Sequence, residues 1–152
     1  MSKHHQYIIE NEEGHSIFRP KGKRFEVLSF ERLAYTSENV SFLSEKIRAN
    51  LTDDLISNDV RKKYPSGHPR WNRTLFGQCV PATFAFLYFM NTNILSPVRG
   101  EDIEGEGHWW LIDNNNGNII DLTKDQYGTD ELVSVYSTGK KRGYYGFREA
   151  PA

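Results

Sequence analysis

The 152-residue chain contains a single cysteine, Cys79, and this scarcity excludes several kinds of fold and site. One cysteine cannot form a disulfide within the chain, and it excludes most structural zinc sites, which depend on several thiolates. The five histidines do not combine with carboxylates at metal-ligand spacing, and no HExxH motif is present. We therefore expect no metal and no cofactor. Cys79 is left as a free thiol, used either for chemistry or as a small buried apolar residue.

The chain also has no excess of charge of one sign and no long apolar run. Lys and Arg number 19 and Asp and Glu 20, so the net charge offers no general attraction to nucleic acid or to an anionic membrane. The longest apolar run, residues 80–90, is too short to span a bilayer, and the polar start MSKHHQYIIENEEG has no signal-peptide core. We expect a cytoplasmic protein with neither nucleic acid nor a membrane as partner. The composition indicates no oligomeric state.

What the chain does have is enough apolar material for one core, with 38% hydrophobic and 13% aromatic residues. We expect one domain over residues 1–152, with strands in residues 1–36, helices in 37–64 and a core in 71–127. Residue periodicity and turn signals predict the individual elements. They are strands at 6–10, 16–19 and 25–36, helices at 37–51, 52–63 and 80–91, a loop at 93–107, a hairpin at 108–123 and a last strand at 131–137.

The segment after Cys79 reads VPATFAFLYFM and is apolar on nearly every face, which is typical of a helix buried on all sides. Pro81 is tolerated in the first helical turn, where its missing N–H has no intrahelical acceptor, so Cys79 falls at the helix N-terminus. Free N–H groups and the positive end of the helix dipole stabilise a thiolate there. The same backbone donors can receive an oxyanion. Cys79 is therefore a candidate nucleophile, against the alternative of an inert core residue.

His108 and Asp121 lie 13 positions apart in HWWLIDNNNGNIIDLT, an odd spacing that puts both side chains on one face of a hairpin with an even-numbered loop. A turn at 114–115 sets them directly opposite, and a four-residue loop at 114–117 sets them diagonally. A turn at 116–117 separates them by two pairs. A cysteine at a helix start, with His and Asp on paired strands, matches the nucleophile, base and orienting group of acyl-transfer sites. The alternative is that His108 bonds the backbone and Asp121 only precedes a turn.

Two stretches, FGQCVPATFAFLYF and GHWWLIDNNNGNIIDLTKDQY, resemble the YunG-like family of uncharacterised bacterial proteins. That family combines a GQC-plus-helix element with a His-led strand and a G-x-x-x-DLT-x-DQ[FY] strand and turn. The order Cys, His, Asp is also similar to that of the papain-like and transglutaminase-like superfamily, in which the cysteine begins a buried helix packed on a sheet bearing His and Asp. The resemblance covers residues 71–127 and implies this fold, with Cys79, His108 and Asp121 in those roles. It implies no particular substrate.

Papain-like peptidases also carry an oxyanion-hole glutamine a few residues before the cysteine, where this chain has Arg73. The nearest glutamine is Gln78, directly before Cys79. Gln78 is therefore a candidate for oxyanion binding or for support of the site. Asp125 and Gln126, which follow the hairpin, are candidates for the same supporting role.

Three tryptophans are candidates for the wall of a cleft: Trp71, Trp109 and Trp110. Adjacent strand residues point to opposite faces, so we expect one of Trp109 and Trp110 in the core and the other at the cleft. The acidic, glycine-containing segment 101–107 runs directly into His108. It is either a mobile lid or an ordinary surface loop.

Together these patterns predict an α+β fold of the papain-like or transglutaminase-like type, in which a buried helix led by Cys79 packs on an antiparallel sheet carrying His108 and Asp121. The expected function is that of a cysteine hydrolase or acyl transferase that attacks an amide, ester or thioester carbonyl through an acyl-enzyme. Peptidase, amidase, deamidase and transglutaminase-like reactions all fit, on a peptide, protein or small acyl substrate. The alternative is a non-catalytic module that binds a peptide or protein on the same fold.

Overall fold

The computed structural model describes residues 18–21, 24–27, 32–51, 56, 58–143 and 147–149. These residues form a mixed α+β fold. In chain order the elements are β1 (Phe18–Lys21), β2 (Arg24–Val27), β3 (Leu33–Ala34), α1 (Ser37–Ala49), α2 (Asn58–Lys63), the 3-10 turn η2 (Pro69–Asn72), α3 (Cys79–Phe89), β4 (Met90–Asn91), β5 (Leu95–Glu101), β6 (Gly107–Asp113), β7 (Ile119–Ile120), the 3-10 turn η3 (Lys124–Gln126), α4 (Thr129–Ser137), β8 (Lys140–Lys141) and β9 (Phe147–Glu149).

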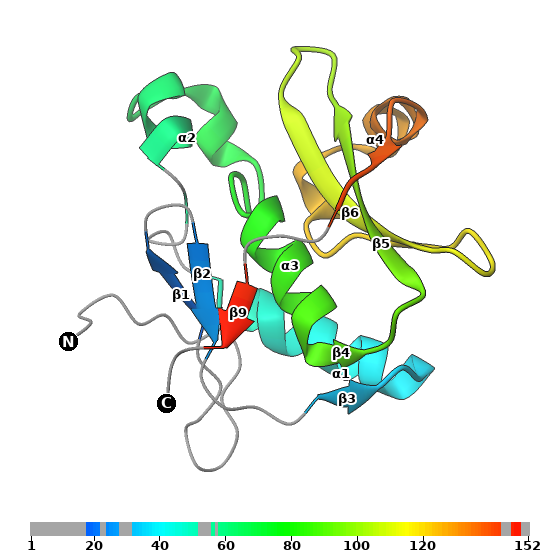
Figure 1. The fold of residues 1–152 in the computed structure, drawn as a ribbon. Coiled ribbons are helices and arrows are strands. Elements are labelled where there is room, and N and C mark those ends of the chain that lie inside the picture. The colour runs from blue at the N-terminus through cyan, green and yellow to red at the C-terminus, as the bar shows by residue number, and fades with distance from the viewer. Residues whose placement is uncertain are drawn as a thin grey trace.

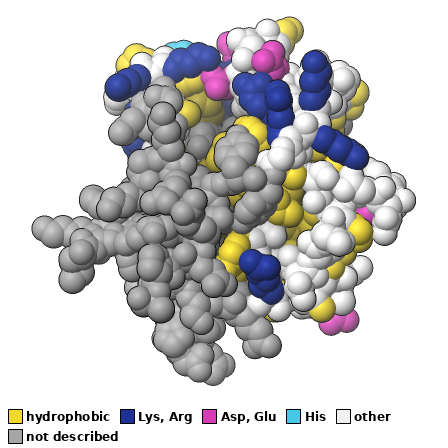
Figure 2. Space-filling view, viewed as in Figure 1, with side chains coloured by type: hydrophobic (Ala, Val, Ile, Leu, Met, Phe, Trp, Pro, Cys, Tyr) yellow, Lys and Arg dark blue, Asp and Glu magenta, His cyan; other side chains and the backbone are white. Residues whose placement is uncertain are grey.

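A four-stranded antiparallel sheet with the order β7-β6-β5-β8 forms one side of the molecule (Figure 1). Its centre is the long pair β5 and β6, which runs from Leu95 opposite Asp113 to Glu101 opposite Gly107. The three-stranded sheet β1-β2-β9 lies on the other side of α3. On the face seen in Figure 2, Lys and Arg side chains gather over the upper part of the β5–β8 region, next to apolar side chains.

Helix α3 lies in the middle of the fold because nearly every side chain on it is apolar. Its fully buried side chains include Phe84, Ala85, Phe86 and Phe89. Leu43 and Ile47 of α1 pack on it, and so do Trp109 and Leu111 from one face of the sheet. Burial of each large side chain of this kind stabilises the fold by about 1.5–3 kcal/mol. The helices expected at 37–51 and 80–91 are confirmed by α1 and α3.

Helix α4 covers the opposite face of the sheet, and the strand expected at 131–137 is wrong. The Glu131 carboxylate accepts a hydrogen bond of 3.0 Å from the N–H group that precedes the helix, which caps its first turn. Two valines of this segment lie on different sides of the helix. Val133 is 67% exposed, whereas Val135 is buried with Tyr136 against the sheet. Helical spacing therefore overrides the strand preference of β-branched residues.

The loop expected at 93–107 is also wrong, because most of it is strand β5. Pro97 suggested a loop, since proline cannot donate to a sheet. In an antiparallel strand the N–H and C=O of one residue point to the same edge, and the Pro97 carbonyl accepts from Arg142 N–H at 2.8 Å. The edge of Pro97 that lacks an N–H therefore faces the end of β8, whose pairing with β5 covers only Val98 and Arg99. Proline is tolerated there because the ladder goes no further.

The remaining expectations concern the N-terminal third. The strand expected at 6–10 lies outside the described residues. The strand at 16–19 overlaps β1, and the one at 25–36 is divided between β2 and β3. Of the helix at 52–63, α2 contains the last six residues, while 52–55 and 57 lie outside the described residues. None of the helices in the described ranges is long and apolar enough to cross a membrane.

Gly100 tests how tightly α4 is packed on the sheet. A Cβ at this position would lie 2.7 Å from the Trp110 ring and 2.7 Å from the Val135 carbonyl oxygen. We expect Gly100→Ala to lower the free energy of unfolding by about 1–3 kcal/mol, because the added methyl overpacks this contact. Gly143→Ala is the matched control, since its Cβ would meet nothing within 4 Å. Equal urea denaturation midpoints for the two variants would contradict the contact.

Candidate active site

The chain places Cys79 at the first residue of α3 through a tight loop. Leu75 has a φ of 56° and Gly77 a φ of 81°, so the backbone turns sharply just before the helix. Hydrogen bonds from Phe76 N–H to the Arg73 carbonyl and from Gln78 N–H to the Leu75 carbonyl, each 3.2 Å, hold this turn. Cys79 is 9% exposed, at the positive end of the helix dipole.

The hairpin brings His108 and Asp121 together by the diagonal register. Asp113 N–H donates to the Asn118 carbonyl at 2.8 Å, which closes a four-residue loop over residues 114–117. Leu111 then lies opposite Ile120, so Asp121 falls diagonally across from His108. His108 Nε2 lies 2.7 Å from Asp121 Oδ2, and both side chains are almost fully buried.

Asp121 is held by two donors besides the imidazole. Its Oδ1 accepts from Thr123 N–H at 3.1 Å, and its Oδ2 accepts from the Tyr136 hydroxyl at 2.9 Å. Burial and the adjacent Asp121 charge both raise the pKa of Tyr136, so its hydroxyl keeps its proton and stays a donor. Sequence patterns did not point to this role, because residues 131–137, which include Tyr136, were expected to form a strand.

The charge of His108 follows from its neighbours. Burial lowers its pKa, but the hydrogen bond with Asp121, the nearby Cys79 side chain and the charges of both groups outweigh this and raise the pKa of His108 to about 9. Nε2 is engaged by Asp121, whereas Nδ1 is buried and forms no hydrogen bond within the described residues. The nitrogen left for the Cys79 thiol is therefore Nδ1. At neutral pH the imidazole is a cation beside the sulfur.

Aromatic rings fix the plane of the imidazole. The Tyr127 ring meets it edge to face at 5.0 Å between centroids, and the Trp110 ring lies 5.7 Å away. The three side chains that the sequence singled out thus come together, from α3, β6 and the turn after β7.

No protein-family model, curated protein or solved structure matches this chain. What the site can do is therefore judged from its own residues. Within the described part of the chain, no group of three or more His, Cys, Asp and Glu side chains is placed to hold a metal ion.

A pocket of about 240 Å³ opens at Cys79. Trp109 forms part of its wall, as do apolar residues of α3 and of the preceding loop. Its lining residues are Val60, Phe76, Gly77, Cys79, Val80, Pro81, Arg99, Glu106, Gly107, Trp109, Gln126 and Tyr127. Trp71, also a candidate for the cleft wall, does not line it. Of Trp109 and Trp110, which were expected to point to opposite faces, Trp109 lines the pocket and Trp110 does not. Trp71 packs on Phe76 and donates to the Tyr64 carbonyl, whereas Trp110 packs against Tyr136 under α4.

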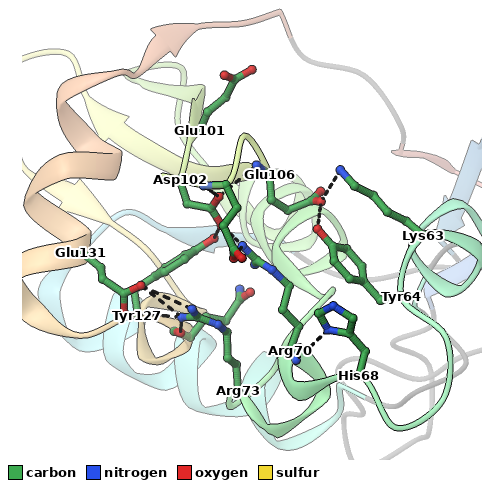
Figure 3. Close-up of polar contacts among 12 residues, drawn as sticks. Lys63, Tyr64, His68, Arg70, Arg73, Glu101, Asp102, Glu106, Tyr127 and Glu131 are labelled. Atoms are coloured by element: carbon green, nitrogen blue, oxygen red, sulfur yellow. Dashed lines mark hydrogen bonds and ion pairs between the residues drawn. The ribbon is translucent and has the colours of Figure 1, made fainter.

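A buried ion pair that the sequence did not reveal anchors one wall of this pocket (Figure 3). Arg70 Nη2 donates a hydrogen bond to Asp102 Oδ2 at 2.7 Å, and the Tyr127 hydroxyl donates to the same oxygen at 3.1 Å. Both members of the pair are almost fully buried. Arg70 comes from η2 and Asp102 from the β5–β6 turn, so the pair ties the loop before α3 to the hairpin.

The turn at 102–106 is held from several sides. Asp102 N–H donates to the Glu106 carbonyl at 2.9 Å, and the Glu106 carboxylate bonds the Tyr64 hydroxyl and, at 2.8 Å, Lys63. Arg70 also bonds Glu104. For the segment 101–107, this bonding favours an ordinary, fixed hairpin turn over a mobile lid.

The residues expected to support the site take different places. Gln126 lines the pocket, and its Nε2 is buried without a hydrogen-bond partner among the described residues. Arg73 Nη1 donates to the Gln126 carbonyl at 2.8 Å, so Arg73 fixes the turn that carries this amide. Gln78 is buried outside the pocket lining, and its Oε1 has no partner within the same residues.

Asp125 does not face the pocket. It forms an ion pair of 2.7 Å with Arg48 of α1, on the surface. Arg48 also donates to the Leu122 carbonyl at 2.7 Å. Asp125 therefore ties the segment after Asp121 to α1 and does not line the pocket.

The charge of His108 can be checked by NMR. We expect its imidazole to stay protonated through neutral pH and to titrate near pH 9. In Asp121→Asn the carboxylate is lost while burial remains, so the pKa of His108 should fall by about one unit or more. The His68 ring, which packs on Tyr64, is the internal reference, and its chemical shifts at neutral pH should be the same in both proteins. A His108 titration that is the same in both proteins would contradict the pairing.

Proposed function

We propose that this protein is a cysteine hydrolase or acyl transferase with a papain-like or transglutaminase-like arrangement of its site, and a member of the YunG-like family. The observation that carries the proposal is the buried Asp121–His108 pair, whose free Nδ1 is left for Cys79 at the mouth of a pocket. The proposed setting is the cytoplasm, and the proposed substrate is a peptide, a protein or a small acyl compound.

In the proposed reaction, Cys79, His108 and Asp121 take part in both acylation and deacylation. The Cys79 thiolate attacks the carbonyl carbon, forming a C–S bond, and His108 gives its Nδ1 proton to the leaving amine, alcohol or thiol as that bond breaks. Asp121 holds the imidazole and stabilises its charge. Water or an amine then attacks the acyl-enzyme, giving its proton to His108. The C–S bond breaks, and the thiolate and imidazolium are restored.

The proposed oxyanion site combines backbone and side-chain donors. The first N–H groups of α3 have no acceptor within the helix, and they adjoin the sulfur. The Gln126 amide lines the same pocket and has an unsatisfied buried donor. It supports the proposal because an unpaired buried amide is unfavourable unless a ligand bonds it. Gln126 would thus do what a glutamine near position 73 does in papain-like peptidases, with Arg73 holding it in place.

The decisive experiment is to trap the acyl-enzyme. Incubation with a panel of activated esters, thioesters and aryl amides should leave an acyl group on Cys79, detected by intact-mass spectrometry. Cys79→Ala should abolish the adduct, and His108→Ala and Asp121→Asn should slow its formation by about 10²–10⁴-fold. His68→Ala is the matched control, because His68 lies outside the triad and the pocket lining, and it should react at the wild-type rate.

Two results would oppose catalysis. One is a Cys79 that resists iodoacetamide at pH 6.5, below the ordinary cysteine pKa of about 8.5, and gains reactivity only as the protein unfolds. The other is a protein that binds peptides in the pocket but never carries an acyl group. Either result would favour the non-catalytic binding module.

Gln126→Leu separates oxyanion binding from thiol reactivity. We expect it to slow acylation by carbonyl compounds by about 10²–10³-fold, because the tetrahedral intermediate loses a donor. Alkylation by iodoacetamide should change little, since displacement of iodide creates no oxyanion. Gln78→Leu tests the other glutamine and should have the smaller effect on acylation. If Gln126→Leu slows both reactions equally, Gln126 only supports the structure around Cys79.

A further inference from the structure

A second hollow, of about 440 Å³, lies at the β5–β8 edge of the sheet. We call it the basic groove, and it is lined by Arg99, Gly100, Glu101, Ser137, Thr138, Gly139, Lys140 and Arg142. Three of these side chains are cations and one is a carboxylate. The basic groove lies where the Lys and Arg side chains gather beside apolar ones in Figure 2.

The cations of the basic groove are poorly compensated by the residues that the structure describes. Arg99 of β5 pairs directly with Lys140 of β8, and like charges directly opposite on paired strands destabilise a sheet. In the described part of the chain, Arg99 forms one ion pair, with Glu101 at 3.3 Å, and neither Lys140 nor Arg142 forms any. An anion bound between them would remove this repulsion.

Arg99 joins the basic groove to the pocket at Cys79, because it lines both. It lies opposite Trp109 in the sheet, so Trp109, Arg99 and Lys140 form a row across one face. The guanidinium lies directly over Gly107, where a Cβ would come within 2.6 Å of Arg99 Nη2. The absence of a side chain at Gly107 is thus what lets the cation reach the pocket.

We propose that the basic groove binds an anionic group, phosphate or carboxylate, on the substrate whose carbonyl reaches Cys79. This inference rests on the proposed function and names the class of substrate, an acyl compound with an oxyanion beyond the acyl group. The acyl part occupies the mostly apolar pocket, and the oxyanion lies across Arg99, Lys140 and Arg142. Arginine suits this role because its planar donors bind two oxygens of a phosphate or carboxylate at once.

The first test measures anion binding by calorimetry on the full chain. Inorganic pyrophosphate should bind, and Lys140→Gln should weaken binding by about tenfold, as expected for a lost charged hydrogen bond. Lys141→Gln is the matched control, because this neighbouring lysine of β8 does not line the basic groove and should leave binding unchanged. Glutarate serves as the carboxylate probe, so that the tighter of the two ligands identifies the type of oxyanion.

The second test links the basic groove to Cys79 by using two alkylating reagents that differ in charge. Both form the same C–S bond with loss of iodide, but iodoacetate is an anion and iodoacetamide is neutral. The ratio of the iodoacetate rate to the iodoacetamide rate should fall several-fold in Arg99→Gln. Added pyrophosphate should lower this ratio in the wild-type protein.

The outcomes separate this inference from the proposed function. Absence of binding by both anions, or equal weakening by Lys140→Gln and Lys141→Gln, would overturn the basic groove as an anion site even if Cys79 forms an acyl-enzyme. A rate ratio unchanged by Arg99→Gln would disconnect the groove from Cys79. If pyrophosphate binding depends on Lys140 but no acyl group ever forms on Cys79, the groove stands as an anion site and its role in an acyl reaction fails.

Discussion

The need to bury α3 on every side determines how the rest of the structure is arranged. A helix that is apolar all round is stable in water only when other elements cover it. Here α1 and one face of the sheet cover it, with Trp109 and Leu111 in direct contact with its core. The helix must begin somewhere inside this enclosure. Its first residue, Cys79, is therefore buried, at the end of the sheet that carries His108.

Enclosure of His108 creates a second constraint, because a buried charge without a partner is costly. Removing an ion from water carries a penalty of several kcal/mol, and only close partners and further hydrogen bonds offset it. Asp121 supplies the partner charge, and Tyr136 and Thr123 satisfy its remaining lone pairs. Since α4 brings Tyr136, this helix takes part in setting the charge of His108 through Asp121. Stability and site chemistry are coupled through this one carboxylate.

Local patterns in the sequence predicted α1, α3 and the hairpin, because apolar spacing and turn residues act over short distances. They left three hairpin registers open, and the choice depends on Asp113, whose carboxylate accepts from Asn115 N–H at 2.8 Å and so shapes the four-residue loop. Strand β5 was missed because the place where β8 ends, which makes Pro97 tolerable, is a property of the sheet. Arg70 and Tyr136 were missed because their partners are distant in the chain. Of the expected supporting residues, Gln126 reaches the pocket and Asp125 does not.

One end of the sheet gathers the groups of both the candidate site and the basic groove, and this follows from the direction of the elements. The N-terminus of α3, the start of β6 and the end of β5 all meet there, so Cys79, His108 and Arg99 come from three different elements. The buried Arg70–Asp102 pair ties η2 to the β5–β6 turn at the same end. A ligand bound at this end would lie near the N-terminus of α3, Arg99 of β5 and Lys140 of β8. All of these favour negative charge, and an oxyanion is the species that the proposed acyl transfer and the proposed anion binding would both place there.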